Sequence, residues 1–380
     1  MVARICLVSG GTGGHLVPAL TLARAIRERG HEPFLVTEGR SVENALLARE
    51  ANDLEVLGLP GGRPSKLRLP SWLLQTTWRA RKLLREQSAG CVVSTGGRSS
   101  VPMGLAARSL GKPLFLLEQN AVTGRANRLL RPFAQRTYLG LPGRDVDRAG
   151  AVLTGTPLRP EFQGQDRAQV REQLGLDAAR PVVLVTGGSQ GARALNETVP
   201  MALGMLAGKA AHNAIDGDAA QRRRVHRPRR DVQVLHLAGV GNEAAVRERY
   251  LAHEMAGPVV VQPMAANMAQ LLVAADLVIC RGGGTTVAEL MAVGRPAIIV
   301  PYPHHRDQQQ LCNADVLVRA GAAVVLEESR LDAERLYETL TALMLVPDRL
   351  PAMGAAAGRL ATSDAAVAIL DDMERQGGLG

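Results

Sequence analysis

Aromatic residues, paired cysteines and long apolar segments are all scarce in this chain of 380 residues. Phe, Trp and Tyr make up only 3% of it, which leaves few side chains able to stack on nucleic-acid bases. The four cysteines, Cys6, Cys91, Cys280 and Cys312, are far apart and form no Cys-x-x-Cys pair, so neither a disulfide framework nor a zinc site is expected. No apolar run is long enough to span a bilayer, and the chain starts directly with a strand-like run instead of a signal sequence. We therefore expect a protein that is cytoplasmic or peripheral to a membrane.

Positive charge is concentrated in one segment of the chain. The formal net charge is +9, and six arginines between positions 222 and 230 supply most of it. Such a run is usually a solvated loop, and this one has no interleaved aromatic residues and no recognised nucleic-acid motif. A basic nucleic-acid-binding module remains an alternative from a different functional class, but we expect no nucleic-acid partner.

Four segments repeat one pattern: an apolar strand-like run, a Gly-Gly loop and then a helix-like stretch. The loops start at Gly10, Gly96, Gly187 and Gly282. Continuous apolar strands followed by helices indicate parallel sheets covered on both faces. The helix-like stretches also end at glycines, as C-caps do, and each then leads into another strand. These glycines are Gly30, Gly111, Gly294 and Gly321.

A turn-rich connection from Thr154 to Pro160 separates two rounds of this pattern. We therefore predict an α/β protein of two Rossmann-like domains with parallel sheets and an interdomain cleft, 1–155 and 156–350. Residues 351–380 are expected to contain a C-terminal helix that can pack back across the boundary. The stretch 208–231 has no periodic apolar pattern and is predicted to be an exposed insertion.

The loop from Gly10 to His15 lies where a strand leads into a helix, so its backbone N–H groups favour an anion such as a diphosphate. A dinucleotide fingerprint would need glycine at position 16, where Leu16 stands, and no Walker A motif follows any strand. Glu38 could still act as the acidic ribose ligand of a nicotinamide site, which leaves an oxidoreductase open. Tight strand–helix packing is the structural alternative.

His15 stands at the predicted helix start, where the positive end of the helix dipole disfavours imidazolium. We therefore expect a neutral ring that can accept a proton. The alternative is that His15 only caps the turn or contacts a phosphate.

Five motifs resemble, in order and spacing, those of the MurG family of glycosyltransferases. They are Gly10 to His15, Gly96 to Pro102, Glu118 to Asn120, Gly187 to Asn196, and Arg281 to Glu289. The resemblance covers nearly the whole chain and implies the GT-B fold of two Rossmann-like domains. It also implies inverting transfer of N-acetylglucosamine from UDP-N-acetylglucosamine to the C4 hydroxyl of undecaprenyl-diphosphate-linked N-acetylmuramoyl-pentapeptide. Another GT-B enzyme, such as a UDP-N-acetylglucosamine 2-epimerase or a lipid-sugar transferase with a different acceptor, would share the donor site and remains an alternative.

The resemblance places donor recognition mainly in the second domain. It implies that Glu289 accepts hydrogen bonds from both ribose hydroxyls and that the backbone around Ala265 recognises uracil. Residues near the diphosphate would be Gly284, Thr285, Thr286 and Ser189. Gln309 and Gln310 would contact the sugar hydroxyls, and Arg159 would bind donor oxygens or close the hinge.

In the first domain, the resemblance places His15 in the cleft, and we expect it to be the catalytic base, assisted by Glu118. The other residues implied to line the cleft on this side are Thr12, Gly13, Gly14 and Asn120. The mechanism implied by the resemblance and the lack of a convincing Asp-x-Asp motif predict neither a cofactor nor an obligatory metal. The Asp-x-Asp pairs present, at Asp145 and at Asp216, lie in a turn-like region and in the insertion.

Some assignments have structural alternatives. Glu289 could be a first-turn helix acid, Asn120 a turn former, and Gln308 to Gln310 a solvated run. Asn267 also departs from the family pattern, because an acidic residue commonly precedes Met268, and this puts the uracil loop in doubt.

Both tryptophans, Trp72 and Trp78, lie between Lys66 and Arg85 among leucines and basic residues. This composition is typical of an amphipathic element on a membrane surface, with Leu69, Trp72 and Leu73 as its expected apolar contacts. Packing of the same residues on the first sheet is the alternative. The place of this segment in the MurG-like pattern favours an anionic membrane as a partner, at the cytoplasmic face of the cell membrane.

Overall fold

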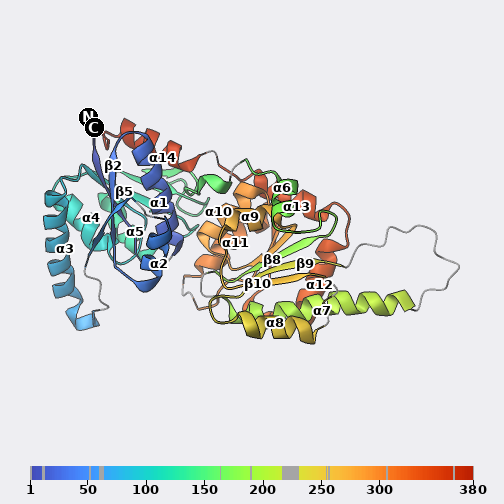
Figure 1. The fold of residues 1–380 in the computed structure, drawn as a ribbon. Helices are drawn as coiled ribbons and strands as arrows, with labels where there is room; N and C mark the ends of the chain where they lie inside the picture. Colours follow the sequence, from blue (N-terminus) through green and yellow to red (C-terminus); the bar gives the residue numbers. More distant parts are fainter. Residues whose placement is uncertain are drawn as a thin grey trace. The chain divides into compact units, whose positions relative to one another are not determined.

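The computed structural model has two α/β units, each built on its own parallel sheet (Figure 1). The residues it describes are 2–10, 13–50, 53–59, 64–162, 164–188, 191–215, 231–253, 255, 257–304, 307–362 and 364–379. The first unit comprises Met1–Arg159, Gly283–Ala288 and Thr362–Gly380, and the second comprises Pro160–Gly282 and Glu289–Ala361. The prediction of two Rossmann-like domains with parallel sheets is confirmed.

The first unit has a seven-stranded sheet in the order β3-β2-β1-β4-β5-β6-β7. Its strands are β1 (Arg4–Val8), β2 (Glu32–Thr37), β3 (Glu55–Gly58), β4 (Cys91–Ser94), β5 (Leu114–Glu118), β6 (Arg136–Leu139) and β7 (Ala151–Leu153). Its α-helices are α1 (Gly13–Glu28), α2 (Ser41–Glu50), α3 (Leu69–Glu86), α4 (Ser100–Ser109), α5 (Arg125–Leu130) and α14 (Ala365–Arg375). Two short 3-10 turns, Lys66–Arg68 and Arg131–Phe133, complete the unit.

Side chains of β1 explain why this strand is an uninterrupted apolar run. Ile5 and Leu7 belong to a core shared with α1 and α14, whereas Cys6 and Val8 belong to a second core shared with α3 and α4. Successive residues of a strand point to opposite faces, so both faces of this sheet are buried. Figure 1 shows α3 and α4 on one side of the sheet and α1 on the other.

Helix α14 belongs to the first unit although it lies near the end of the chain. Its Ile369, Leu370 and Met373 join the core around α1. Polar contacts hold its outer side as well: Arg29 pairs with Asp371 and Glu374 at 2.5 and 2.9 Å.

The second unit has a six-stranded parallel sheet in the order β10-β9-β8-β11-β12-β13. Its strands are β8 (Val182–Thr186), β9 (Gln233–Leu237), β10 (Val259–Gln262), β11 (Leu277–Cys280), β12 (Ala297–Ile299) and β13 (Ala323–Val325). Its α-helices are α6 (Arg167–Gln173), α7 (Arg193–Ile215), α8 (Glu243–Ala252), α9 (Met268–Ala274), α11 (Gln309–Arg319), α12 (Ala333–Met344) and α13 (Arg349–Gly358). Helix α10 (Gly284–Val293) is divided, with its residues up to Ala288 in the first unit and the rest in the second. Two 3-10 turns are Pro160–Phe162 and Glu328–Arg330.

Two predicted segments differ in the structure. The single helix expected near the C-terminus is two helices, because the Asp364 side chain caps a new helix at Ala366 and Val367 after α13 has ended. The expected insertion starts as a continuation of α7 up to Ile215, in a segment rich in alanine, the residue with the highest helix propensity. Residues 216–230, which include the arginine run and Asp216, lie outside the described residues.

The predicted helix C-caps are confirmed. Gly30, Gly111, Gly294 and Gly321 all have positive φ, the left-handed conformation that ends a helix and that other residues adopt only with strain.

Candidate active site

The Gly-rich loops follow the strands at which each sheet reverses its order. In the first unit, the chain runs outward from β1 to β2 and then returns to place β4 on the other side of β1. In the second unit, β8 and β11 are related in the same way. Ligands of open parallel sheets bind at the carboxyl ends of the strands at such a reversal. Each unit therefore presents one candidate ligand-binding edge.

Glycines allow the loops after β1 and β4 to touch. A side chain at Gly97, whose φ is +97°, would collide with the carbonyl group of Gly10. The Gly10 N–H also donates to the Gly96 carbonyl at 3.2 Å. These glycines are needed for backbone contact, in agreement with the packing alternative, and the contact brings both loops to the start of α1.

His15 lies in the first turn of α1 and is half-buried. Its Nδ1 lies 2.7 Å from the carbonyl oxygen of Thr95 and 3.1 Å from Oε1 of Gln119. The ring also packs on Gly96, where an added Cβ would come within 2.9 Å of the ring carbon Cε1. Loops after three neighbouring strands, β1, β4 and β5, thus meet at this imidazole.

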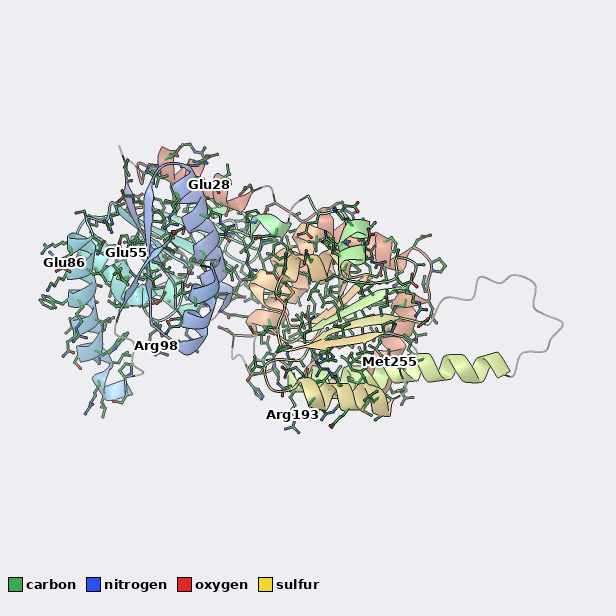
Figure 2. All side chains as sticks on the ribbon, viewed as in Figure 1. Glu28, Glu55, Glu86, Arg98, Arg193 and Met255 are labelled. Carbon is green, nitrogen blue, oxygen red and sulfur yellow. The ribbon has the colours of Figure 1, made fainter. Side chains whose placement is uncertain are left out.

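Glu38 occupies the position at which an external anion would meet the loop before α4. Its carboxylate accepts hydrogen bonds from the backbone N–H groups of Arg98 and Ser99, both at 3.2 Å, and pairs with Arg40 (Figure 2 labels Arg98). Because the Glu38 side chain is only 3% exposed, it is not placed to bind a ribose. Glu38 therefore does not serve as the acidic ribose ligand of the nicotinamide site that the sequence left open.

Glu118 ends β5 as a buried carboxylate. Its Oε1 accepts from the backbone N–H and the side-chain amide of Asn120 at 3.1 and 3.0 Å. Its Oε2 accepts from the Gly124 N–H at 2.8 Å and from the Asn127 amide at 3.0 Å. Four hydrogen bonds from the following loop and from α5 surround this carboxylate, so the geometry gives Glu118 the role of fixing the loop that contains Gln119 and Asn120.

Among the other predicted residues of the first unit, Gly13 and Gly14 form the first two residues of α1, and Arg159 ends the main segment of the unit. Thr12 lies outside the described residues, as does Ser189 in the second unit.

Asp145 is held by its neighbours. Burial would raise the pKa of its carboxyl group, but hydrogen bonding by Thr123 and the charges of Arg148 and Arg131 lower the pKa overall.

In the described residues, we find no cluster of three or more His, Cys, Asp or Glu side chains that could hold a metal ion.

Helix α10 begins at Gly284 shortly after β11, so its backbone N–H groups follow the carboxyl end of that strand. Thr285 and Thr286 belong to its first turn. Glu289 lies in the second turn and is buried, and therefore is not the first-turn acid of the structural alternative. Burial and the Glu289 charge together raise the pKa of the Cys280 thiol to about 12, which places this carboxylate near the end of β11.

Gln310 supports the loop that leads into α10. Its Oε1 accepts from the backbone N–H groups of Gly282 and Tyr302 at 3.2 and 2.9 Å, and its neighbour Gln309 is the first residue of α11. A side chain at Gly282 would collide with the Gln310 carbonyl. The side-chain oxygen of Gln310 is thus engaged within the protein.

Ala265 is half-buried in a largely exposed loop between β10 and α9. Asn267, the departure from the family pattern, is the N-cap of α9, and its Oδ1 accepts from the Gln270 N–H at 3.3 Å. Asn and Asp are equally good N-caps, so the substitution preserves the cap of α9.

Asn196 belongs to a buried network behind the second sheet edge. Its Oδ1 lies 3.0 Å from Nε2 of His236, whose Nδ1 lies 2.9 Å from the Tyr250 hydroxyl. The Asn196 amide donates to the Ala238 carbonyl at 2.8 Å and so fixes the loop that follows β9. Burial lowers the pKa of His236 to about 4, which keeps this imidazole neutral.

The outer face of α3 is apolar and basic. Thr76, Ala80 and Leu84 are four residues apart and buried, and Ala80 and Leu84 join the core shared with β1 and α4. On the opposite side, Leu74 and Trp78 are 74% and 66% exposed, and Leu67 in the preceding turn is 94% exposed. Basic residues Lys82 and Arg85 are exposed on the same side (Figure 2 labels Glu86 near the end of the helix). We call Leu67, Leu74, Trp78, Lys82 and Arg85 the α3 surface.

Trp72 and Leu73, two of the expected membrane contacts, are half-buried, whereas Leu69 is exposed. The reason is the helical period, which turns positions 72 and 73 towards the sheet and positions 74 and 78 away from it. None of the helices in the described part of the chain combines the length and hydropathy needed to cross a bilayer.

Two family models match the chain, the glycosyltransferase family 28 N-terminal domain at residues 5–139 and the family 28 C-terminal domain at residues 182–369. A relative from Stutzerimonas stutzeri (strain A1501) is 37% identical over 376 residues, which covers 98% of each chain. The chain belongs to glycosyltransferase family 28. That relative is named UDP-N-acetylglucosamine–N-acetylmuramyl-(pentapeptide) pyrophosphoryl-undecaprenol N-acetylglucosamine transferase.

Solved structures agree with the family 28 assignment. The crystal structure of Acinetobacter baumannii MurG is similar with a TM-score of 0.77 at 26% identity, covering 99% of this chain and 100% of that one. UDP-GlcNAc 2-epimerase from Neisseria meningitidis has a TM-score of 0.65 at 11% identity, covering 98% of this chain and 100% of that one. The second similarity shows a shared fold alone. The predicted GT-B glycosyltransferase fold is confirmed.

Proposed function

We propose that this family 28 enzyme transfers N-acetylglucosamine from UDP-N-acetylglucosamine to the C4 hydroxyl of undecaprenyl-diphosphate-linked N-acetylmuramoyl-pentapeptide. The observation that carries the proposal is the 37% identity, over 98% of both chains, to a transferase named for this reaction. The imidazole of His15, held at the carboxyl edge of the first sheet, supplies the base that such a reaction needs.

The chemistry is a single displacement at the anomeric carbon. His15 accepts the proton of the acceptor hydroxyl while that oxygen bonds to the anomeric carbon. The bond from the same carbon to the β-phosphate oxygen breaks, and its electron pair leaves with UDP. Attack opposite the leaving group inverts the anomeric configuration. Negative charge grows on the leaving diphosphate, and the N–H groups at the start of α10 are suited to stabilise it, together with Ser189, Thr285, Thr286 and Arg159.

Donor recognition is the proposed task of the second unit. Glu289, with a carboxylate near the end of β11, accepts both ribose hydroxyls, and the loop around Ala265 recognises uracil through its backbone. Gln309 and Gln310 contact the sugar. The first unit binds the acceptor through Gly13, Gly14 and Asn120, and Glu118 holds Asn120 in place.

The lipid anchor of the acceptor requires the enzyme to work at a membrane. We assign membrane contact to the α3 surface, because leucine and tryptophan side chains that face solvent next to Lys82 and Arg85 suit the interface of an anionic bilayer. The protein would then be peripheral, at the cytoplasmic face of the cell membrane.

A transfer assay with labelled donor tests the function. With UDP-N-acetylglucosamine and the lipid-linked acceptor we expect labelled disaccharide lipid and free UDP, and with the donor alone we expect no change. Formation of the C2 epimer from the donor alone would support the epimerase alternative instead. Transfer to other lipid-linked sugars at an equal kcat/KM would contradict the proposed acceptor.

A further inference from the structure

Two segments of the chain, Thr95–Gly96 and Gln119, enclose the ring of His15. The Thr95 carbonyl oxygen lies 2.7 Å from Nδ1, and Oε1 of Gln119 lies 3.1 Å from the same atom. Gly96 lies against the ring edge that joins Nδ1 to Cε1, with no room for a side chain. Both polar neighbours therefore converge on a single ring nitrogen.

This convergence decides which nitrogen carries the proton of the neutral ring. A backbone carbonyl can only accept a hydrogen bond, so Nδ1 must be the N–H donor and the lone pair must lie on Nε2. The Gln119 amide then has to present its oxygen to Nδ1, because its NH₂ group would set two donors against each other. The Thr95 carbonyl thus sets the tautomer, and Gln119 in this orientation adds a second acceptor that supports it.

The orientation of Gln119 has a cost that His15 explains. Gln119 is buried, and its Nε2 has no hydrogen-bond partner in the part of the chain that the structure describes. A buried donor without a partner destabilises a protein, because it has lost its hydrogen bonds to water without gaining an acceptor. Packing alone does not require the Gln119 NH₂ group to be buried without a partner. Directing the Gln119 oxygen at His15 Nδ1 does require it.

The two acceptors are held by the strands from which they extend. The backbone N–H and the hydroxyl of Thr95 both donate to the Val8 carbonyl, at 2.9 and 3.2 Å. Gln119 lies between Glu118 and Asn120, which are joined by two hydrogen bonds. The ring is therefore held by a rigid frame formed by β1, β4 and β5.

We propose that Gln119 is a positioning residue that, with the Thr95 carbonyl, holds His15 in the Nδ1–H tautomer and so makes Nε2 the proton-accepting atom. The catalytic consequence rests on the proposed function, in which His15 is the base. The tautomer itself does not, because it belongs to the resting protein.

Nitrogen NMR of the full chain with ¹⁵N-labelled histidine tests the tautomer directly. The His15 signals are assigned by their disappearance in His15→Gln, and the spectra are recorded at a pH where the ring is neutral. We expect Nδ1 at the shift of a protonated nitrogen and Nε2 at the shift of an unprotonated one. The opposite pattern in the wild-type protein would overturn the proposal without any variant of Gln119.

Two replacements separate the acceptor oxygen from the shape of the side chain. Gln119→Met keeps the length but removes one of the two acceptors at Nδ1, so we expect a fraction of the rings to adopt the Nε2–H form while the Thr95 carbonyl retains the rest. We expect kcat to fall up to about tenfold, as for loss of other groups that orient an imidazole. Gln119→Glu restores an acceptor and should restore the wild-type tautomer and more of kcat than Met does. Gln135→Met, at an exposed position in the same unit, is the matched control.

The outcomes also distinguish this inference from the proposed function. A Gln119→Met protein with wild-type tautomer populations overturns the inference, whatever its activity. If His15→Gln keeps full kcat while the wild-type ring shows Nδ1–H, the base assignment fails and the positioning role of Gln119 stands. If Gln119→Met melts at a much lower temperature than the wild type, the nitrogen spectrum of Gln119→Glu tests the inference instead. The Nε2–H form in that variant would then overturn the inference.

Discussion

His15 is a residue whose replacement should separate catalysis from binding, because its ring is only half-buried and contacts the first unit through Nδ1. In His15→Gln we expect kcat to fall about a hundredfold or more, since a general base acts in the transition state. UDP affinity, measured by calorimetry, should stay within about twofold of the wild type. A loss confined to UDP affinity, with kcat unchanged, would make His15 a binding residue.

Glu289 offers a second test at the scale of one residue. Because it is buried near Cys280, we choose Glu289→Gln, which keeps the shape of the side chain. The neutral amide of the variant accepts hydrogen bonds from the ribose hydroxyls less strongly than the carboxylate does. UDP binding should therefore weaken by about 2 kcal/mol, or roughly thirtyfold. The control is 2′,3′-dideoxy-UDP, which the wild type should bind weakly and the variant should bind no worse. An equal loss for both ligands would show that Glu289 acts through structure instead.

The sequence motifs located His15 and Glu118, but the contacts of Glu38 and Gln119 could not be predicted from them. Glu38 lies in the loop after β2, and its partners Arg98 and Ser99 lie far along the chain before α4. Gln119 was part of a recognised tripeptide, yet its role depends on Thr95 and His15 from other strands. Such contacts follow from the order of strands in the sheet, which residue spacing alone does not reveal.

At the level of elements, the central strands were predictable because both of their faces are buried. β1, β5, β8 and β11 are continuous apolar runs, and the structure has them where the sequence indicates. Edge strands are harder to predict from the sequence. One edge of such a strand pairs with no other strand, and its side chains are partly exposed, which weakens the apolar pattern. β3, for example, has no fully buried residue. The division of the C-terminal segment into α13 and α14 depends on the Asp364 cap, which a search for apolar periodicity does not detect.

The network behind β9 predicts a pH dependence of stability for the second unit. Burial lowers the pKa of His236 to about 4 from an ordinary value of 6.5, so below pH 6.5 the unfolded state binds a proton that the folded state does not. Stability is therefore complete above pH 6.5 and declines as the pH falls towards 4. The loss should be about 2 kcal/mol between pH 7 and pH 5.

Hydrogen exchange of the β8 and β9 amides, corrected for intrinsic rates, measures this decline. Tryptophan fluorescence would miss it, because Trp72 and Trp78 both lie in the first unit. We expect His236→Asn to be less stable at pH 7 but to lose about 2 kcal/mol less on acidification. The strands of the first unit serve as an internal control. Equal acid sensitivity in the wild type and the variant would show that His236 does not cause the decline.

At the scale of the whole molecule, the fold leaves the reaction open, because a UDP-GlcNAc 2-epimerase shares it at 11% identity. Identity along both family 28 domains decides in favour of a transferase. The α3 surface adds a property that neither sheet accounts for. It places apolar and basic side chains together in solvent, which is costly unless a partner covers them.

Membrane binding through the α3 surface is tested with the variant Leu67→Ser, Leu74→Ser, Trp78→Ser. These side chains are exposed, so the fold should survive, and loss of their apolar contact should reduce co-sedimentation with phosphatidylglycerol vesicles at least about tenfold. Binding of the wild type should also fall as salt rises, since Lys82 and Arg85 each contribute about 1 kcal/mol near an anionic surface.

Activity then connects this surface to the reaction. The α3 variant should lose transfer to the long-chain acceptor in vesicles but keep transfer to a soluble short-chain analogue. The matched control is Leu129→Ser, Val240→Ser, Leu251→Ser, which removes comparably exposed apolar side chains outside α3 and should leave both activities unchanged. If the α3 variant instead loses both activities equally, its side chains support the fold or the active site, and another surface must meet the membrane. If the control variant fails to bind vesicles while the α3 variant still binds, membrane contact lies at the control positions instead.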